Sequence, residues 1–501
     1  MRALIEECPT AHGVDSLAAR LQHEPGLVCL RTGSFDVPSA RYSFVAVHPF
    51  LTVRALGSRC ELTLNTGNSV HYGNPWQILA PLLEGFELLD DVDVPFPLGG
   101  CFGYWGYDLK QFVEPRLSRR AINDLELPDC QLGFYPSLVA FDHRLGRTWI
   151  VATGLGSDGS RTEVRARDQV AWWRAQLQST PPEFSNCLSI PYPTRPPSDW
   201  NSSMGRDAFL KAVRRAQEYI RAGDIYQVNL AQRLSAPCPI SAWTFFERLV
   251  EVSPAPFSSF LNAGDFQVVS SSPELFLRMS GGHILTRPIK GTRPRSNDPI
   301  RDAQLTYELQ RSEKEMAELV MITDLLRNDL GRVCEYGSVQ VPELVRLERY
   351  PQVQHLVSTI EGRIRPGLSH LDALAACFPG GSITGAPKIR AMEIIDELEP
   401  VARGPYCGCH GYLGFNRESQ LSITIRTAVV KDGHAWFHVG AGIVADSQPE
   451  SEYEETLAKG SGLMAALSSA LNQEILGEIP KHAIHKTTGS LKSDEAHRTD
   501  A

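Results

Sequence analysis

The sequence predicts an α+β fold for this chain of 501 residues. In both halves, segments rich in β-branched and aromatic residues follow one another with only turn residues between them, which is typical of consecutive strands. Helical patterns stand before or after these runs and do not alternate with single strands. A doubly wound parallel sheet would require that alternation, so a mixed α+β fold is the better prediction.

Residues 1–180 are predicted to form a strand-rich N-terminal part. The segment 99–109, GGCFGYWGYDL, alternates glycine with aromatic residues, as strands with closely approaching backbones do. A helix rich in alanine and arginine is expected at about 161–178, and the proline-rich segment 180–199 marks the boundary to the next part. The other strand-forming segments are 41–56 and 137–154.

Residues 200–471 are predicted to form the second part, which carries the candidate site. Its first helix, 206–222, is amphipathic and ends at Gly223. The chain is polar from about 477, and disorder is predicted for 477–501. Further helices are expected at 312–330, 386–398 and 452–471, and strands in 225–234, 266–279, 411–415, 421–430 and 435–444.

Charge and composition argue against several functional classes. The net charge is −9, with 58 acidic and 49 basic side chains, which gives no electrostatic reason to expect nucleic acid. No apolar run approaches the roughly 20 residues of a membrane span, and the N-terminus lacks the pattern of a signal peptide. Eleven cysteines, an odd number without a framework, predict a reducing compartment, the cytoplasm. Cys407 and Cys409 stand too close together for a zinc knuckle.

The segment TRPIKGTRPR, residues 286–295, places one lysine among prolines and arginines. Pro288, Gly291 and Pro294 predict a rigid turn with Lys290 at its centre. Alone, this pattern favours a solvated basic turn, because lysine is rarely buried without a partner. A functional role for Lys290 therefore depends on what the rest of the chain brings to it.

The helix predicted over 312–330 carries a carboxylate on an apolar face. Ser312 and Glu315 form a capping-box pattern, so Glu315 is assigned to the helix N-terminus. Glu318 instead shares a face with apolar residues and with Asp329, which predicts that it points into the protein. A buried carboxylate is costly unless it is paired or bound to a cation.

The helix predicted over 452–471 adds further acidic groups. A second capping-box pattern, SEYE at 451–454, is expected at its start. Glu452, Glu455 and Lys459 share one face of this helix. Carboxylates from two helices suit Mg²⁺, which takes one or two protein carboxylates and fills its other positions with water and substrate oxygens. The spacing therefore makes a magnesium site one candidate interpretation.

Several features favour a small substrate with more than one negative charge. The glycine-rich loop 380–387 runs into a helix, where free backbone N–H groups and Lys388 attract an anion. The loop lacks the pattern GxxxxGK[ST], so a nucleotide is not expected. Gly440 and Gly442 allow close approach of backbone to a ligand. Arg426, which alternates with apolar neighbours in a predicted strand, suits a paired contact with a carboxylate.

The motifs of the chain from about 201 to 467 resemble those of the chorismate-utilising enzymes, which include anthranilate, aminodeoxychorismate, isochorismate and salicylate synthases. The matching motifs, in order, are GDIYQVNLAQR, SSSPELFL, RPIKGTRPR, LVMITDLLRNDLGRV, FPGGSITGAPKIRAMEIIDELEP and GAGIVADSQPESEYEET. The resemblance implies a single α+β body with two large antiparallel sheets packed face to face and helices outside, as in anthranilate synthase component I. The proline-rich segment would then cross within this body.

The resemblance also implies roles for single residues. The general acid that helps the C4 hydroxyl of chorismate to leave corresponds to Glu274, and the active-site histidine corresponds to His355. The Mg²⁺ ligands correspond to Glu318 and Glu455, with Glu452 nearby through water. The substrate contacts correspond to Gly291 and Thr292 at the ring, to Gly440, Ala441, Gly442 and Lys459 at the ring carboxylate, and to Tyr412 and Arg426 at the enolpyruvyl carboxylate.

Two positions divide this family. Isochorismate and salicylate synthases resemble KVVLSR where this chain has QVNLAQR, so Gln227 replaces their water-activating lysine. Anthranilate synthases resemble PIAGT where this chain has PIKGT, and a lysine there marks the aminodeoxychorismate branch. Free lysine, with a pKa near ~10.4, is a poor nucleophile, but a pocket beside Arg287 or Arg293 lowers its charge. The resemblance implies that Lys290 attacks ring C2, after which ammonia adds at C4 to give 4-amino-4-deoxychorismate, a precursor of 4-aminobenzoate and folate.

Two alternatives stay open beside this interpretation. One is an anthranilate synthase, against which Lys290 stands, and the other is a catalytically silent tryptophan-sensing or scaffold subunit, against which the full set of site residues stands. No nucleophile elbow of a glutamine amidotransferase occurs in the chain. Ammonia is therefore expected from a separate glutaminase subunit in a heterodimer.

A tryptophan ligand is a further expectation from the resemblance. Family members hold tryptophan in segments that match three stretches of this chain: 29–35, 40–44 and 253–260. Thr32 stands where relatives have serine, and Phe257 stands where anthranilate synthases have tyrosine. These departures leave tryptophan binding open.

Overall fold

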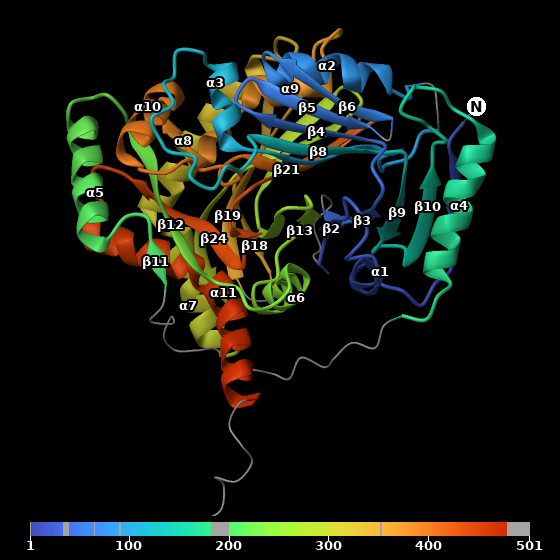
Figure 1. The fold of residues 1–501 in the computed structure, drawn as a ribbon. Coiled ribbons are helices and arrows are strands. Elements are labelled where there is room, and N and C mark those ends of the chain that lie inside the picture. Colours follow the sequence, from blue (N-terminus) through green and yellow to red (C-terminus); the bar gives the residue numbers. More distant parts are fainter. Residues whose placement is uncertain are drawn as a thin grey trace, which may run out of the picture.

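Two twelve-stranded antiparallel sheets, packed face to face with helices outside them, form the body of the molecule (Figure 1). The computed structural model describes residues 2–33, 40–64, 66–89, 92–181, 200–350 and 353–477. The α+β fold and the pair of packed sheets expected from the sequence are thereby confirmed. Most of the proline-rich segment 180–199 and almost all of the predicted tail 477–501 lie outside the described residues.

The first sheet takes strands from both ends of the chain. Its order is β1 (Leu4–Glu7), β10 (Arg147–Ala152), β9 (Ser137–Asp142), β3 (Tyr42–Ala46), β2 (Val28–Arg31), β13 (Phe257–Asn262), β14 (Gln267–Ser272), β23 (Thr427–Lys431), β24 (His434–Ile443), β12 (Gln227–Pro237) and β11 (Asn201–Ser202), with β20 (Gly385–Ala386) beside β12. Strands from before and after the proline-rich segment therefore lie in one sheet.

The second sheet is built in the same way. Its order is β17 (Ile289–Pro294), β19 (Val353–Arg363), β16 (His283–Arg287), β15 (Leu275–Ser280), β22 (Glu418–Ile423), β21 (Cys409–Gly414), β7 (Gly100–Trp105), β8 (Cys130–Tyr135), β4 (Leu51–Leu56), β5 (Arg59–Leu64) and β6 (Gly67–Tyr72), with β18 (Gln340–Arg349) beside β19. The glycine–aromatic segment predicted as closely packed strand is β7, at the centre of this sheet.

Alternation along the strands separates two apolar cores. Phe44 and Ala46 of β3 belong to the core between the sheets, whereas Val45 belongs to a second core beneath the helices on the outer face of the first sheet. Side chains at successive positions of a strand point to opposite faces, so one short strand serves both cores. The sheets therefore pack through apolar side chains, and a polar site between them needs a local break in this pattern.

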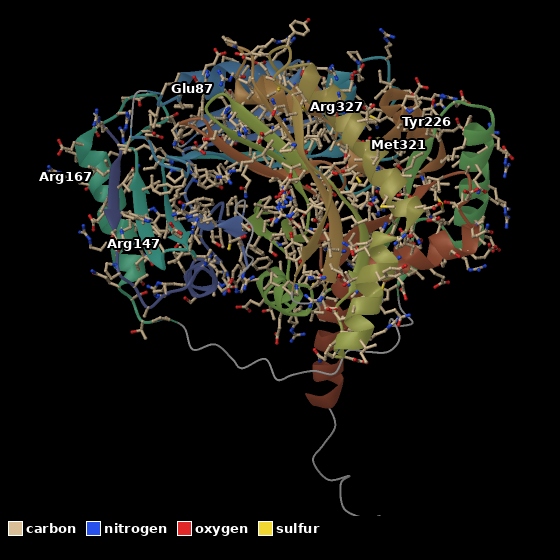
Figure 2. All side chains as sticks on the ribbon, turned by 180° about the vertical axis from the view of Figure 1, so that it is seen from behind. Glu87, Arg147, Arg167, Tyr226, Met321 and Arg327 are labelled. Atoms are coloured by element: carbon tan, nitrogen blue, oxygen red, sulfur yellow. The ribbon has the colours of Figure 1, made fainter. Side chains whose placement is uncertain are left out.

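Helices cover the sheets on their outer sides. Those around the first sheet are α1 (Val14–Arg20), α4 (Glu163–Leu177), α5 (Arg206–Arg221), α6 (Ala242–Val252), α10 (Lys388–Leu398) and α11 (Pro449–Gly477); the others are α2 (Pro75–Gly85), α3 (Lys110–Val113), α7 (Pro299–Gln310), α8 (Glu313–Gly331) and α9 (His370–Cys377). The view from behind shows α8 on the outside of the molecule, where Met321 and Arg327 are labelled (Figure 2).

The helices predicted from caps and apolar faces are present. Those expected at 161–178, 206–222, 312–330 and 386–398 are α4, α5, α8 and α10. The last helix, α11, begins earlier than predicted, at Pro449, so Ser451 lies inside it and the predicted cap at 451–454 is wrong.

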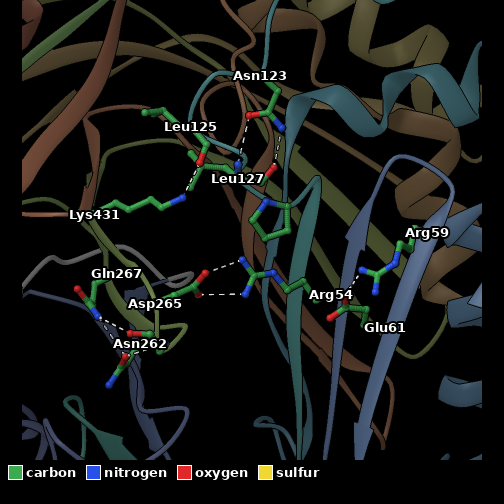
Figure 3. Close-up of polar contacts among 12 residues, drawn as sticks. Arg54, Arg59, Glu61, Asn123, Leu125, Leu127, Asn262, Asp265, Gln267 and Lys431 are labelled. Carbon is green, nitrogen blue, oxygen red and sulfur yellow. Dashed lines mark hydrogen bonds and ion pairs between the residues drawn. The ribbon is translucent and has the colours of Figure 1, made fainter. Parts of the chain in front are cut away.

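Polar contacts at the surface also join the two sheets (Figure 3). Arg54 of β4 forms an ion pair of 2.7 Å with Asp265, which lies in the turn between β13 and β14. Lys431 of β23 donates a hydrogen bond of 2.6 Å to the carbonyl of Leu125, in the segment that leads to β8. These contacts tie a turn and a strand of the first sheet to a strand and a connection of the second.

Candidate active site

Lys290 lies in a bulged strand, not in the turn that its neighbours predict. Lys290 pairs with Leu356 and Thr292 pairs with His355, so Gly291 is the extra residue of a β-bulge. Gly291 has a φ of 68°, and a Cβ there would lie 2.6 Å from an oxygen of Glu315. Glycine is therefore required at this position, and the bulge re-aims the side chain of Lys290.

The side chain of Lys290 is half-buried, and the predicted acidic residues act electrostatically on its amine. Burial lowers its pKa; the charge of Glu318 opposes this effect, Lys459 adds to it, and Glu274 and Glu455 oppose it more weakly. Its one hydrogen bond in the described residues is a long contact of 3.5 Å to the carbonyl of Ser382. A lysine with a lowered pKa and weak hydrogen bonding has the properties of a nucleophile.

Glu274 lies in the connection between β14 and β15 and acts electrostatically on this amine. Its side chain is buried, with 5% of its surface exposed. Burial raises its pKa, although a hydrogen bond from Ser382, the charge of Lys290 and a backbone hydrogen bond from Ile289 act in the opposite direction. A buried carboxyl with a raised pKa is suited to donate a proton.

Two crossings between the sheets hold the polar groups of the site. One crossing joins β14 to β15 and carries Glu274; the other joins β22 to β23 and carries Arg426. They are linked by hydrogen bonds from Ser272 Oγ to the Ile423 carbonyl at 2.6 Å, from Ile423 N to the Glu274 carbonyl at 3.0 Å, and from Ser271 N to the Arg426 carbonyl at 3.1 Å. The local break in the apolar packing thus lies where two strands change sheets.

Arg426 does not lie within a strand, which corrects the prediction from its apolar neighbours. It lies between β22 and β23 and has a φ of 50°, which is uncommon for a residue other than glycine. Burial lowers the pKa of its guanidinium, and among the described residues its side chain has no hydrogen bond or ion pair. A guanidinium without a protein partner is available to an anionic ligand.

His355 is brought close to Arg426 and Thr292. Its Nδ1 lies 2.9 Å from Oγ1 of Thr292. Burial, and then the charge of Arg426, lower the pKa of His355 to about 4, while a backbone contact with Gly291 acts against them. The imidazole is therefore neutral near pH 7, so it acts through hydrogen bonds and not as a cation.

The glycines of β24 face the interior beside Gln227. Gly442 pairs with Asn229 of β12, and a Cβ at Gly442 would lie 2.5 Å from Nε2 of Gln227. A Cβ at Gly440 would lie 2.8 Å from the hydroxyl of Tyr406. Side chains are thus excluded at both glycines, while the side chain of Ala441 points to the other face of β24.

Three carboxylates reach the site from α8 and α11. Glu318 is half-buried on α8, and Glu455 on α11 is exposed and pairs with Lys459 at 2.7 Å. Glu452 is buried and accepts a hydrogen bond of 2.6 Å from Ser447. Burial, and then the charge of Glu455, raise the pKa of Glu452, although Ser447 and nearby lysines act against them. Lys314 lies 4.0 Å from Glu452, so a lysine stands beside each of the two carboxylates on α11.

The described residues contain no preformed cluster of three or more carboxylate, histidine or cysteine groups for a metal ion. Mg²⁺ does not need such a cluster, because it keeps several water or substrate oxygens as ligands. Lys459 donates a hydrogen bond of 3.0 Å to the carbonyl of Gly440, which joins the acidic face of α11 to the glycine segment. Glu318, Glu452 and Glu455 offer the oxygen ligands that Mg²⁺ prefers, so the residue types fit that ion.

Tyr412 packs among aromatic rings, and its predicted contact with the enolpyruvyl carboxylate beside Arg426 stays a prediction. Its ring lies 5.2 Å from that of Phe102 and 5.3 Å from that of Phe44. Tyr412 lines a hollow together with Thr32 and Phe257, which belong to the stretches matched to tryptophan binding. This hollow is called the second hollow, to distinguish it from the candidate active site around Lys290. The tyrosine beside the glycine segment is Tyr406. The sequence offers both tyrosines in one short segment, and no local pattern distinguishes them.

Two further residues have different partners from those expected. Lys388, assigned to an anion, forms an ion pair of 2.6 Å with Asp329 and donates 3.1 Å to the Cys377 carbonyl. Glu315 is held at 2.9 Å by Arg293, and only the Ser312 side chain caps the helix. The loop before α10 thus contributes Ser382 to the site and not a free cation.

The fold thus brings together an amine of lowered pKa, a buried carboxyl group and a guanidinium without a partner among the described residues. The family described as chorismate binding enzyme matches residues 40–465. Aminodeoxychorismate synthase component 1 of Escherichia coli (strain K12) is 40% identical over 90% of this chain and 95% of that protein. The chain belongs to the chorismate-binding enzyme family, whose substrate, chorismate, carries two carboxylates.

Other relatives show how close two activities are within this family. Anthranilate synthase component 1 of Thermus thermophilus is 45% identical over 84% of this chain and 89% of that protein. The crystal structure of anthranilate synthase component I from Streptococcus pneumoniae matches with a TM-score of 0.75 and 31% identity, over 87% of this chain and 94% of that one.

No helix among the described residues is long and apolar enough to span a membrane.

Proposed function

We propose that the chain is the chorismate-aminating subunit that makes 4-amino-4-deoxychorismate, with Lys290 as its nucleophile. The observation that carries this proposal is the amine of Lys290, which has no ion pair within 4.0 Å among the described residues and only a 3.5 Å contact to the Ser382 carbonyl, while the buried carboxyl of Glu274 acts on it electrostatically. An unpaired lysine at that place has no structural use, whereas an amine of lowered pKa near an acid is the pair that a substitution on an allylic alcohol needs.

The first step joins Lys290 to the substrate. Its Nζ forms a bond to ring C2, the two ring double bonds shift along the ring, and the bond between C4 and its oxygen breaks. Glu274 gives its proton to that oxygen, which leaves as water. The raised pKa of Glu274 keeps the proton available, and the lowered pKa of Lys290 keeps the electron pair available.

The second step releases the lysine. Ammonia forms a bond to C4, the double bonds shift back, and the bond between C2 and Nζ of Lys290 breaks. The new ammonium gives one proton to the carboxylate of Glu274, which restores the acid. The sum is chorismate plus ammonia giving 4-amino-4-deoxychorismate plus water, and Lys290 is unchanged at the end.

Binding groups surround this pair on several sides. Arg426 is available for one carboxylate of chorismate, and the backbone of Gly440, Ala441 and Gly442 for the other. Glu318 and Glu455, with Glu452 beside them, would hold Mg²⁺, which when bound neutralises negative charge on the substrate. Thr292 and the neutral His355 fix the wall next to the bulge.

The ammonia is proposed to come from a glutaminase subunit. Relatives are named component 1, and a motif for glutamine hydrolysis is missing from the sequence. Tryptophan is a proposed ligand of the second hollow, where the stretches 29–33, 40–44 and 253–260 meet around Tyr412. This hollow offers aromatic walls and the hydroxyl of Thr32, which donates 2.7 Å to the Pro256 carbonyl.

Anthranilate synthesis is the second candidate, favoured by the 45% identity to the Thermus thermophilus enzyme. The deciding experiment incubates the purified chain with chorismate, Mg²⁺ and an ammonium salt and identifies the product. We expect 4-amino-4-deoxychorismate, and a loss on the order of a thousandfold in Lys290→Ala, as for an essential nucleophile. Lys211→Ala, at an exposed position of α5, is the matched control and keeps full activity.

Other products decide against the proposal. Anthranilate from the parent chain means that Lys290 is not the nucleophile and that the second candidate is right. If neither the parent nor Lys290→Ala consumes chorismate, and both are folded, the subunit is catalytically silent.

A further inference from the structure

The bulge that carries Lys290 is joined to helix α8 by one arginine. Nη1 of Arg293 donates a hydrogen bond of 2.9 Å to the carbonyl of Thr292 and another of 2.9 Å to Oε1 of Glu315. Thr292 directly follows the bulged Gly291 in β17, and Glu315 lies in the first turn of α8. One guanidinium nitrogen therefore links the backbone of the bulge to the start of the helix.

The side chain of Glu315 also lies directly against the bulge. A Cβ at Gly291 would be 2.6 Å from Oε2 of Glu315 and 2.8 Å from Cδ1 of Leu309 on α7. This Oε2 is buried, and among the described residues it has no hydrogen-bond partner. A buried oxygen without a partner costs free energy, so the placement of this carboxylate lowers stability where it touches the bulge.

Glu315 does not have the partner that its position in the helix predicts. The capping-box pattern at 312–315 would direct its carboxylate to the backbone N–H of Ser312. The hydroxyl of Ser312 accepts from N of Glu315 at 3.4 Å, but the carboxylate of Glu315 pairs with Arg293. A contact with β17 thus replaces a contact within α8.

Thr292 is held at both of its polar groups. Its carbonyl accepts the hydrogen bond from Arg293, and its hydroxyl lies 2.9 Å from Nδ1 of His355. Lys290 and Thr292 stand on the two sides of Gly291, so fixing Thr292 fixes one end of the bulge. The direction of the Lys290 side chain, at the other end, then follows from the backbone between them.

Helix α8 also brings an acidic group to Lys290. Glu318 lies three residues after Glu315, so the two side chains extend from the same face of α8. Glu318 acts electrostatically on the amine of Lys290. The contact of Glu315 with the bulge therefore sets how far this face of α8 lies from the strand that carries the amine.

We propose that Arg293 and Glu315 are positioning residues, which hold the bulge of β17 against α8 and so direct the amine of Lys290 toward the substrate. The inference rests on the proposed function, because it concerns the nucleophile of that reaction. A displacement of about 1 Å between reacting atoms can cost on the order of a hundredfold in rate. Neither residue has to touch the substrate to act in this way.

Arg293→Met removes the guanidinium and keeps an unbranched side chain. The test measures kcat and KM for chorismate with the full chain, Mg²⁺ and saturating ammonium chloride. We expect kcat to fall about tenfold and KM for chorismate to change less than about twofold, because the groups that bind the substrate stay in place. Arg293→Lys keeps a cation near the same two oxygens and restores most of kcat.

Glu315→Gln and the double variant show whether the two residues act as one unit. Glu315→Gln keeps the shape of the side chain beside Gly291 and removes the charge that pairs with Arg293. We expect the double variant to lose no more of kcat than Arg293→Met alone, because each residue acts through the other. Losses that multiply would indicate independent roles and overturn the proposal.

Arg295→Met is the matched control. Arg295 pairs with Asp302 of α7 at 2.9 Å, and the exposed fractions of these side chains, 31% and 17%, are close to the 28% and 21% of Arg293 and Glu315. This pair joins the same segment to a different helix, so the control keeps the parent kcat. An equal fall of kcat in Arg295→Met overturns the proposal, because any loosening of the segment would then have the same effect.

Thermal unfolding shows which variants are folded at the assay temperature. If Arg293→Met does not fold, Glu315→Gln alone is measured, and a fall of kcat at constant KM is again expected. An unchanged kcat in the folded variants overturns the proposal and leaves the parent activity in place. A parent chain that forms no 4-amino-4-deoxychorismate refutes the proposed function itself, which is a different result.

Discussion

The amines of Lys110 and Lys290 lie in two different regions of the molecule, and the two regions differ in the groups that surround the amine. Lys110, at the start of α3, lies 3.1 Å from Asp396 and 3.9 Å from Asp108, and its amine is 4.6 Å from the centre of the Tyr107 ring. Lys290 has no ion pair within 4.0 Å among the described residues, and its contact to Ser382 is 3.5 Å long.

The comparison separates a structural amine from a chemical one. Lys110 has partners for its charge, so it stabilises the fold and is not a reactive group. Several carboxylates act electrostatically on Lys290, but none among the described residues is close enough to hold its proton by a direct hydrogen bond. Burial without a close partner lowers the pKa of the amine, which is a cost to stability and a gain in nucleophilicity.

Breaking the structural pair gives the largest expected effect on stability. Lys110→Met leaves the buried carboxylate of Asp396 without its cation, so the free energy of unfolding falls by about 3–5 kcal/mol. Urea unfolding of the variant and the parent at pH 7 measures this difference. The folded fraction keeps its affinity for chorismate, because the pair lies outside the site. A decrease below about 1 kcal/mol would show that Lys110 does not hold this region.

Glu274, the acid proposed to act with Lys290, provides the next test of this comparison. Glu274→Gln replaces the carboxyl group by an amide of the same shape, so the side chain can no longer donate an acidic proton. The rate of product formation therefore falls on the order of a hundredfold. Steady-state kinetics with ammonium salt give the rate, and chorismate binding is measured separately.

Glu418→Gln is the matched control for this substitution. Burial raises the pKa of Glu418 as well, and its partner is Ser280, at the far end of β15 from Glu274. The control variant keeps the parent rate. If both variants lose activity equally, the proton of Glu274 has no special role.

Much of the fold could be predicted from short sequence patterns, because helix caps and apolar helix faces depend on residues that are close together in the chain. Ser312 caps α8 as predicted, and the apolar face of 206–222 becomes α5. The segment 286–295 shows the limit of such prediction. Its prolines and Gly291 suggest a turn, but pairing with β19 extends it as a strand, and that pairing joins residues far apart in the sequence.

The site could be predicted only where a motif carried it. The bulged glycine Gly291, the buried acid Glu274 and the glycines of β24 were assigned through motifs, and no helix or strand periodicity singles them out. Arg426 and Lys388 show what local sequence omits. An apolar run does not reveal that the chain changes sheets at Arg426, and the partner of Lys388, Asp329, belongs to another helix.

The smallest and sharpest prediction concerns the sign of a stability change. The pKa of Lys290 is lowered in the folded protein, whereas in the unfolded chain it is near ~10.4. At pH 7 the unfolded chain binds this proton more readily, so the lysine destabilises the fold there, and the penalty disappears as pH rises toward ~10.4. Lys290→Met should therefore raise the free energy of unfolding by about 1 kcal/mol at pH 7, opposite in sign to Lys110→Met.

Urea unfolding at several values from pH 7 to pH 10 measures this gain, which should shrink as the pH rises. Lys211→Met on α5 controls for the loss of a surface charge and changes stability by less than about 0.5 kcal/mol. A loss of stability in Lys290→Met at pH 7 would mean that the carboxylates around Lys290 hold its charge after all. The amine would then be a structural cation like that of Lys110, and the nucleophile proposed for chorismate would have to be sought elsewhere.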